Sequence, residues 1–192
     1  LPDGPQSSAA SLFSADPKVW LPSLDPIMTR LSLQVRWWQL GGDRDRSFVG
    51  YPQLATTLQQ VRRQLFRLGQ TARLGIGWDW LSEVPADATA AWQFVNLSTT
   101  PSLTETELTA YLAGVDASGP ARWLLVEPLE QGAYDLATRA RDLVLKMMIG
   151  SKGGAEAIFL PDPFDPRHGV LNADGTPGIL LLPWRTTALL IG

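Results

Sequence analysis

The sequence predicts an α/β fold in which short strands alternate with helices to form a parallel sheet. Five short apolar runs rich in β-forming residues are bounded by Gly, Pro, Asp or Ser, and longer runs with helical spacing separate them. The chain has 192 residues, 45% hydrophobic and 18% charged, so it can bury one core and has an ordinary globular composition. These patterns favour either part of a (β/α)8 barrel or an open doubly wound sheet.

The predicted strands are too short for helices and rich in residues that suit a pleated sheet. The run Trp123-Leu124-Leu125-Val126 is apolar on both faces, as expected when helices cover both sides of the sheet. The five strands are expected at residues 33–40, 73–78, 92–97, 122–127 and 157–161. Five strand–helix units in this length match the spacing of a barrel, in which eight units take about 250 residues.

Between the strands lie three amphipathic runs with helical periodicity. Residues 53–68 place apolar side chains three or four positions apart and are followed by Gly69, a helix stop. Residues 104–115 open with the capping-box pattern Thr104-Glu105-Thr106-Glu107. Residues 134–148 form the third run, which we expect Gly150 to end.

Two further segments precede the first predicted strand. Asp25-Pro26 predicts the start of a shorter helix, because Pro is well placed in a first helical turn. Residues 1–16, rich in Ser, Ala, Pro and Gly, have no periodicity and predict an irregular leader.

Composition excludes several function classes. The net charge is −3 and the 16 Lys and Arg are scattered, which predicts no nucleic-acid partner. Apolar runs are shorter than the roughly 20 residues of a membrane helix, which predicts a soluble chain with no membrane partner. The chain has no Cys and one His, so neither a thiolate nor a multi-histidine metal site is expected. No strand is followed by Gly-x-Gly-x-x-Gly, so no dinucleotide cofactor is expected either.

Polar side chains stand where each predicted strand ends, and the carboxyl ends of parallel strands meet at one edge of a sheet. Carboxylates and amides interleaved with flat indoles suit a neutral hydroxylated ligand such as a sugar. An alternative is that the aspartates only cap the helices that follow. The residues concerned are Asp43, Trp78, Asp79, Trp80, Asn96, Glu127 and Asp162.

Three segments resemble the clan A glycoside hydrolases. Trp38-Gln39-Leu40-Gly41-Gly42-Asp43 resembles the Trp-Gln-(aliphatic)-Gly-Asn-Glu segment that ends the fourth barrel strand, and Trp123-Leu124-Leu125-Val126-Glu127 looks like the seventh strand. The segment from Gly169 to Pro177, which contains Asp174-Gly175-Thr176-Pro177, is similar to the loop after the eighth strand. The resemblance implies the C-terminal part of one (β/α)8 barrel, strands four to eight, over about residues 20–190.

The resemblance implies a retaining glycoside hydrolase in which Glu127 is the nucleophile and Asp43 the general acid/base. It implies no cofactor and a carbohydrate partner. Substrate-binding residues are then expected at Gln39, Trp78, Asp79, Trp80, Asn96, Asp162 and His168. Gly42-Asp43 stands where the family has Asn-Glu. The acidic side chain is therefore shorter by one methylene, and the amide of the Asn is missing. That departure supports an alternative, a catalytically degenerate glycan-binding or structural barrel; an enzyme of another chemistry on an open sheet also stays possible.

The chain begins without Met and ends just after an apolar run, which suggests a piece of a longer protein. The expected partners are therefore the remaining barrel strands and further domains of a full-length chain. The compartment does not follow from the residues; an extracellular or cell-envelope location is implied only by the family resemblance.

Overall fold

The computed structural model describes residues 8–31, 33–67, 72–84, 91–114 and 119–192, and within them five parallel strands form one sheet. The strands follow one another across the sheet in chain order, without the reversal that marks a doubly wound sheet. The fold is therefore an α/β partial (β/α)8 barrel, as predicted. The strands are β1 (Trp37–Leu40), β2 (Arg73–Trp78), β3 (Phe94–Ser98), β4 (Ala121–Leu125) and β5 (Ala157–Phe159).

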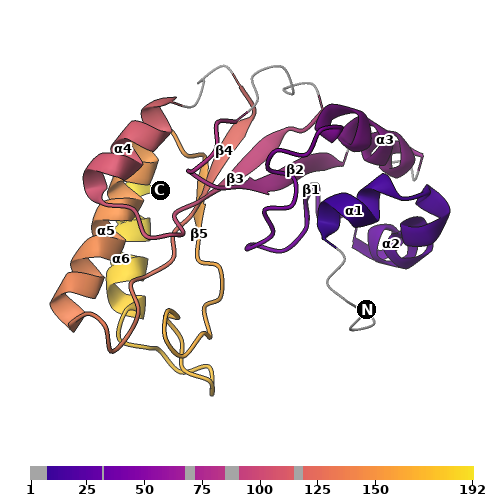
Figure 1. Ribbon diagram of the computed structural model, residues 1–192. Helices are drawn as coiled ribbons and strands as arrows, with labels where there is room; N and C mark the ends of the chain where they lie inside the picture. The colour runs from indigo at the N-terminus through magenta and orange to yellow at the C-terminus, as the bar shows by residue number, and fades with distance from the viewer. Residues whose placement is uncertain (1–7, 32, 68–71, 85–90, 115–118) are drawn as a thin grey trace. The chain divides into compact units, whose positions relative to one another are not determined.

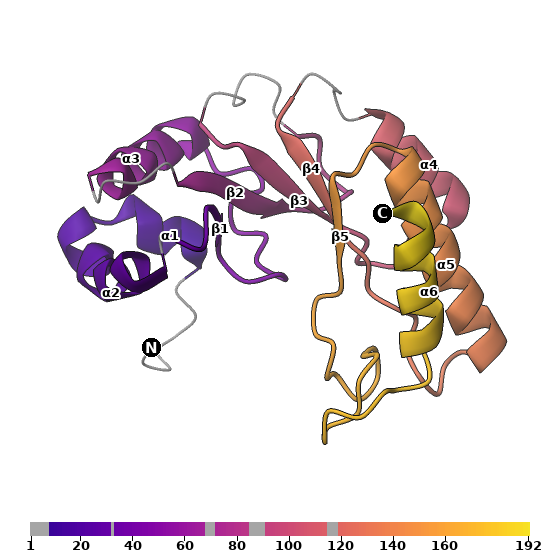
Figure 2. The same cartoon turned by 180° about the vertical axis from the view of Figure 1, so that it is seen from behind.

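The chain divides into two compact units, Leu1–Asn96 (unit 1) and Leu97–Gly192 (unit 2), a division that no sequence pattern predicted. Figure 1 follows them from indigo to yellow, and Figure 2 shows the same elements from behind. The described part of unit 1 holds the helices α1 (Ala9–Ser14), α2 (Pro17–Leu31) and α3 (Leu54–Phe66). That of unit 2 holds α4 (Glu105–Gly114), α5 (Leu136–Lys152) and α6 (Leu181–Ile191).

The core of unit 1 is built on β2, whose side chains are buried from Leu74 to Trp78. Gly75 makes room for the ring of Phe94, which would lie 2.2 Å from a Cβ at that position. The Phe94 ring meets Trp37 edge-on at 5.4 Å between centroids. Gly75 is thus required by close packing between neighbouring strands, since any side chain there would collide with an aromatic ring.

The N-terminal part of unit 1 differs from the prediction. Residues 9–14 of the expected irregular leader form α1, capped by the Ser8 hydroxyl, which accepts from the Ser11 N–H. The Ala9 N–H also donates to Asp45 Oδ2 at 3.1 Å, so α1 is fixed by a contact 36 positions away that no local pattern shows. α2 starts at Pro17 and contains Pro22 and Pro26. The prediction that a short helix starts at Asp25 was therefore wrong.

The first strand is shorter than predicted. β1 begins at Trp37; residues 33–34 form a turn, and residues 35–36 are irregular. Leu33 is 96% exposed, so its apolar character reflects no buried strand face. The other four strands match the prediction to within three residues at each end. All three amphipathic runs are helical. Gly69, which was expected to stop the first of them, lies outside the described residues.

In unit 2, α5 packs against both α4 and α6 (Figure 1). The capping box at the start of α4 is confirmed, because the Thr104 N–H donates to Glu107 Oε2 at 2.8 Å and the Glu107 N–H to Thr104 Oγ1 at 3.3 Å. α6 was not predicted as a helix, since its apolar residues lie on both faces and show little amphipathic periodicity. No helix in the described ranges is long and apolar enough to cross a membrane.

Gly150 does not end the helix that it was expected to stop. α5 continues to Lys152, and Gly153 and Gly154, the latter at φ +81°, close it. Gly150 instead lets α5 lie close to the sheet, because a Cβ there would come within 2.5 Å of the Leu124 side chain of β4. Helix–sheet packing, and not capping, explains this glycine. The segment 150–154 forms the C-terminal turn of α5.

Candidate functional site

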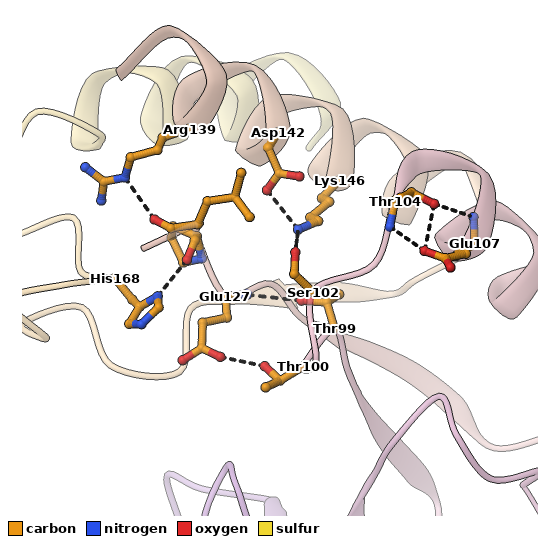
Figure 3. Close-up of polar contacts among 12 residues, drawn as sticks. Thr99, Thr100, Ser102, Thr104, Glu107, Glu127, Arg139, Asp142, Lys146 and His168 are labelled. Carbon is orange, nitrogen blue, oxygen red and sulfur yellow. Dashed lines mark hydrogen bonds and ion pairs between the residues drawn. The ribbon is translucent and has the colours of Figure 1, made fainter. Parts of the chain in front are cut away.

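Glu127 lies just beyond β4, where its backbone and its side chain are both held by hydroxyls from the segment after β3. The Glu127 N–H donates to Thr99 Oγ1 at 3.2 Å, and the Thr100 hydroxyl donates to Glu127 Oε2 at 2.5 Å. Figure 3 shows the carboxylate turned toward Thr100. Glu127 itself is half-buried, so it is both positioned and accessible.

A cavity of about 200 Å³ in unit 2 opens beside this carboxylate. Its walls combine hydroxyls, two carboxylates, a phenol and an imidazole with apolar surface from Pro128 and Leu129. This combination suits a small ligand with several hydroxyls, because each polar wall group can donate or accept while the apolar part contacts C–H groups. The lining residues are Thr99, Thr100, Ser102, Glu127, Pro128, Leu129, Glu130, Tyr134 and His168.

His168 was predicted as a ligand-binding residue, and it lines this cavity. Its Nδ1 lies 2.8 Å from the Pro128 carbonyl, which accepts only if Nδ1 carries the proton. With the proton on Nδ1, the Nε2 atom of the neutral ring can accept a hydrogen bond. The backbone N–H groups of Arg167 and His168 hold Asp165, and the Arg167 bond above all keeps the Asp165 pKa below its ordinary value.

Two buried cations of α5 anchor the loops around the cavity (Figure 3). Arg139 is 4% exposed and donates from Nε to the Leu129 carbonyl at 2.8 Å and from a terminal nitrogen to the Arg167 carbonyl at 3.2 Å. Burial lowers the pKa of its guanidinium. Lys146 is 1% exposed, pairs with Asp142 at 2.8 Å and donates to Ser102 Oγ at 2.9 Å.

A second polar cluster lies in unit 1, with Gln39 in β1, Asn96 in β3 and Asp43 in the loop after β1. The Asn96 amide donates to Gln39 Oε1 at 2.7 Å, and the Gln39 amide lies 3.5 Å from Asp43 Oδ1. Asn96 is 4% exposed, and its buried Oδ1 has no hydrogen-bond partner among the described residues. The structure thus brings together three predicted site residues, and the Asn96 oxygen is an acceptor suited to a hydroxyl donor.

The loop that carries Asp43 is braced against β2. Arg46 donates to the carbonyls of Asp43 at 2.8 Å and Asp45 at 3.0 Å. Gly77 permits this arrangement, because a Cβ there would lie 2.7 Å from the Asp45 carbonyl oxygen. The backbone around Asp43 is therefore well fixed, whereas the contact of its carboxylate with Gln39 is long.

The remaining predicted residues have local roles in the structure. Trp78 is 1% exposed and its indole donates to the Ser82 carbonyl at 2.9 Å, which suits a packing residue. Asp79 accepts from the Leu81 N–H and Asp162 from the Phe164 N–H, at 3.1 and 3.0 Å, so both close turns. Trp80 is half-buried. The ligand contacts expected of these four residues stay predictions.

Sequence reasoning missed the hydroxyls at Thr99 and Thr100 and the cavity residues Glu130 and Tyr134. A run of hydroxyl residues directly after a predicted strand, Ser98-Thr99-Thr100, was the signal available. Asp43 belongs to unit 1 and Glu127 to unit 2, and the joint catalytic role that the resemblance implies for them stays a prediction. Over the described ranges, no group of three or more His, Asp or Glu is arranged to hold a metal.

A wider hollow of about 1050 Å³ lies in unit 1 along α2 and α3. Helix side chains such as Leu21, Gln60 and Arg63 line it, and no strand end contributes. Because barrel chemistry gathers at the carboxyl ends of strands, we place the candidate site at Glu127.

No protein-family model matches this sequence, and no curated protein matches it. Among solved structures, the chain is similar to the β-glucuronidase of Faecalibacterium prausnitzii, with a TM-score of 0.60 and 12% sequence identity. The similarity covers 95% of this chain and 35% of that chain, so this chain spans little more than a third of its length. At this identity the similarity shows the fold alone, a partial barrel shared with a glycoside hydrolase.

Proposed function

We propose that the chain is the C-terminal part of a carbohydrate-active barrel that hydrolyses glycosides with retention, with Glu127 as nucleophile. The observation that carries the proposal is the Glu127 carboxylate, positioned by Thr100 just after a barrel strand and beside a cavity lined with hydroxyls and His168. The fold shared with a β-glucuronidase and the resemblance of the segment ending in Glu127 to a glycosidase strand support the same reaction.

In this mechanism Glu127 attacks the anomeric carbon and the glycosidic C–O bond breaks. Asp43 gives its proton to the leaving oxygen and later takes one from the water that hydrolyses the glycosyl–Glu127 ester. A retaining pair works with its carboxyls about 5–5.5 Å apart, and Asp43 is one methylene shorter than the Glu of the resembling family.

The test compares glycosides whose leaving groups differ in their need for a proton. Glu127→Gln should abolish cleavage of every glycoside, since the amide is no nucleophile, while circular dichroism stays unchanged. Asp43→Ala should remove cleavage of alkyl glycosides but retain the first step with dinitrophenyl glycosides, whose leaving group departs unprotonated. Activity that survives Glu127→Gln would exclude Glu127 as the nucleophile.

A barrel that binds glycans without cleaving them is the second candidate. Asp43 stands where the resembling family has Glu, and its carboxylate lies 3.5 Å from the Gln39 amide, a long contact. Under this alternative, calorimetry detects glycan binding and no glycoside is cleaved. Asp43→Ala then weakens the binding of the glycan.

We also propose that further barrel strands of a longer chain are partners of these units. Exposed apolar side chains of α6 support this, since Leu182, Leu189 and Leu190 are 70%, 74% and 81% exposed. The protein should bind an apolar fluorescent dye and lose that binding when the remaining strands are supplied. Cooperative unfolding of a monomer without dye binding would contradict the proposal.

A further inference from the structure

We infer that Thr100 is a positioning residue for the Glu127 carboxylate and that Thr99 and Thr100 together form a hydroxyl clamp on Glu127; the inference rests on the proposed function. Both threonines follow β3 directly, whereas Glu127 follows β4. The clamp therefore links the ends of two neighbouring strands at the point where the reacting group stands.

Thr99 fixes the backbone of Glu127. It is 1% exposed, its hydroxyl and its N–H both donate to the Leu125 carbonyl at 3.1 Å, and its Oγ1 accepts from the Glu127 N–H at 3.2 Å. One side chain thus satisfies backbone groups on either side of Val126, which sets where the Cα of Glu127 lies and where its side chain starts.

Thr100 fixes the other end of the same side chain. Its hydroxyl donates to Glu127 Oε2 at 2.5 Å, the short distance expected when the acceptor is ionised. The bond defines the rotation of the carboxyl group about its last carbon–carbon bond (Figure 3). A nucleophile held in this way meets the anomeric carbon with less reorganisation than a freely rotating carboxylate.

The segment that carries the clamp is itself anchored. Ser102 accepts from the buried Lys146 of α5 at 2.9 Å, and Lys146 pairs with Asp142. The Thr100 N–H donates to Ser98 Oγ at 3.1 Å, which fixes the turn from the strand end. Thr100 is exposed, so its position depends on these neighbours and not on burial of its own.

The clamp has a specific consequence for the two steps of the reaction. When the glycosyl–Glu127 ester forms, the carboxylate loses its charge, and when water cleaves the ester the charge returns. A donor at Oε2 stabilises the returning carboxylate, so Thr100 should assist breakdown of the glycosyl-enzyme more than its formation. Loss of the hydroxyl should then let the intermediate accumulate.

The experiment uses the dinitrophenyl β-glucoside, β-galactoside and β-glucuronide with the wild-type protein, Thr100→Val and Thr100→Ser. Thr100→Val keeps the shape but removes the donor; kcat should fall about tenfold, with KM falling in parallel because the intermediate accumulates. Mass spectrometry of the quenched protein should show a glycosyl group on Glu127. Thr100→Ser should restore kcat to within about threefold of wild type, since it keeps the hydroxyl.

Thr109→Val on α4 is the matched control, because the Thr109 hydroxyl donates to the Glu105 carbonyl within the exposed surface of the helix; its kinetics should equal wild type. Wild-type kinetics in Thr100→Val, or a fall in kcat with unchanged KM and no trapped ester, would overturn the role of Thr100 and leave the proposed function standing. A wild-type protein that cleaves none of the glycosides and is never labelled on Glu127 would overturn both.

Discussion

The two carboxylates proposed to act together are held very differently. Glu127 in unit 2 receives a 2.5 Å hydrogen bond from Thr100, in a segment anchored to α5 by the hydrogen bond from buried Lys146 to Ser102. Asp43 in unit 1 has a well-braced backbone, but its carboxylate meets the Gln39 amide at 3.5 Å. A nucleophile needs one fixed direction of approach, whereas a proton donor tolerates more freedom.

The largest effect is expected from Lys146, which anchors the Glu127 side. Lys146→Ala removes a buried cation and its stem and leaves Asp142 and Ser102 without their partner, so unfolding free energy should fall by about 3 kcal/mol. Urea denaturation followed by circular dichroism measures this. Lys152→Ala, on the exposed end of the same helix, is the control and should change stability by less than about 0.5 kcal/mol. Equal midpoints for the two variants would show that the anchor contributes little.

A smaller effect is expected from Gln39, which joins the cluster around Asp43. Gln39→Ala leaves the buried Asn96 amide without its acceptor, which should destabilise the protein by about 1–2 kcal/mol. Gln39→Glu serves as the matched comparison, because it keeps an acceptor for Asn96 while removing the amide that faces Asp43. If Gln39→Glu is as unstable as Gln39→Ala, the Asn96 bond is not the cause.

Lengthening Asp43 tests whether the acid side is undersized. Asp43→Glu should preserve activity or raise kcat/KM by up to about tenfold, which corresponds to about 1.4 kcal/mol of transition-state stabilisation. Steady-state kinetics with an alkyl glycoside measure it, since that substrate needs the proton. A gain confined to dinitrophenyl glycosides would contradict an acid role for Asp43.

The smallest expected effect is a difference in acid sensitivity between the units. The pKa of Glu107 lies below its ordinary 4.5, because the Thr104 N–H donates a hydrogen bond to its carboxylate. The pKa of Asp135 lies below its ordinary 3.8, because the Thr138 N–H donates to its carboxylate. A pKa lowered by folding contributes stability that is present above the unfolded value and lost as pH falls through the folded one. Both groups cap helices of unit 2, so α4 and α5 should lose hydrogen-exchange protection below about pH 4 before α3 does. Glu107→Gln should remove the α4 part of that pH dependence, whereas equal loss in all three helices would contradict the prediction.

The sequence predicted the elements whose signals are local. β2 has its predicted bounds, the Thr104–Glu107 capping box forms, and each of the other strands lies within a few residues of its expected place. Periodicity and capping depend on neighbouring residues, so a single sequence contains them. The chain order of the strands followed from the alternation of strands and helices, which favours right-handed crossovers between adjacent parallel strands.

The errors come from contacts between distant residues. α1 depends on Asp45, and Gly150 was mistaken for a stop because its partner, Leu124, lies 26 positions away in the chain. The same holds for the candidate site. Glu127 and His168 were named from strand ends and motif resemblance, but the hydroxyl that holds Glu127 comes from Thr100. Threonine is too common after strands to be singled out without the fold.

Gly150 also determines how closely α5 approaches β4, and therefore where the loops held by α5 lie. The helix carries Arg139 at one end and Lys146 one turn before Gly150, and together they hold three loops at the rim of the cavity. With only a hydrogen atom between α5 and Leu124, any larger residue at position 150 would lift the helix as a rigid rod away from β4. The loops tied to Arg139 and Lys146 would travel with it. A single substitution at position 150, which does not line the cavity, would thus resize the cavity without altering a lining residue.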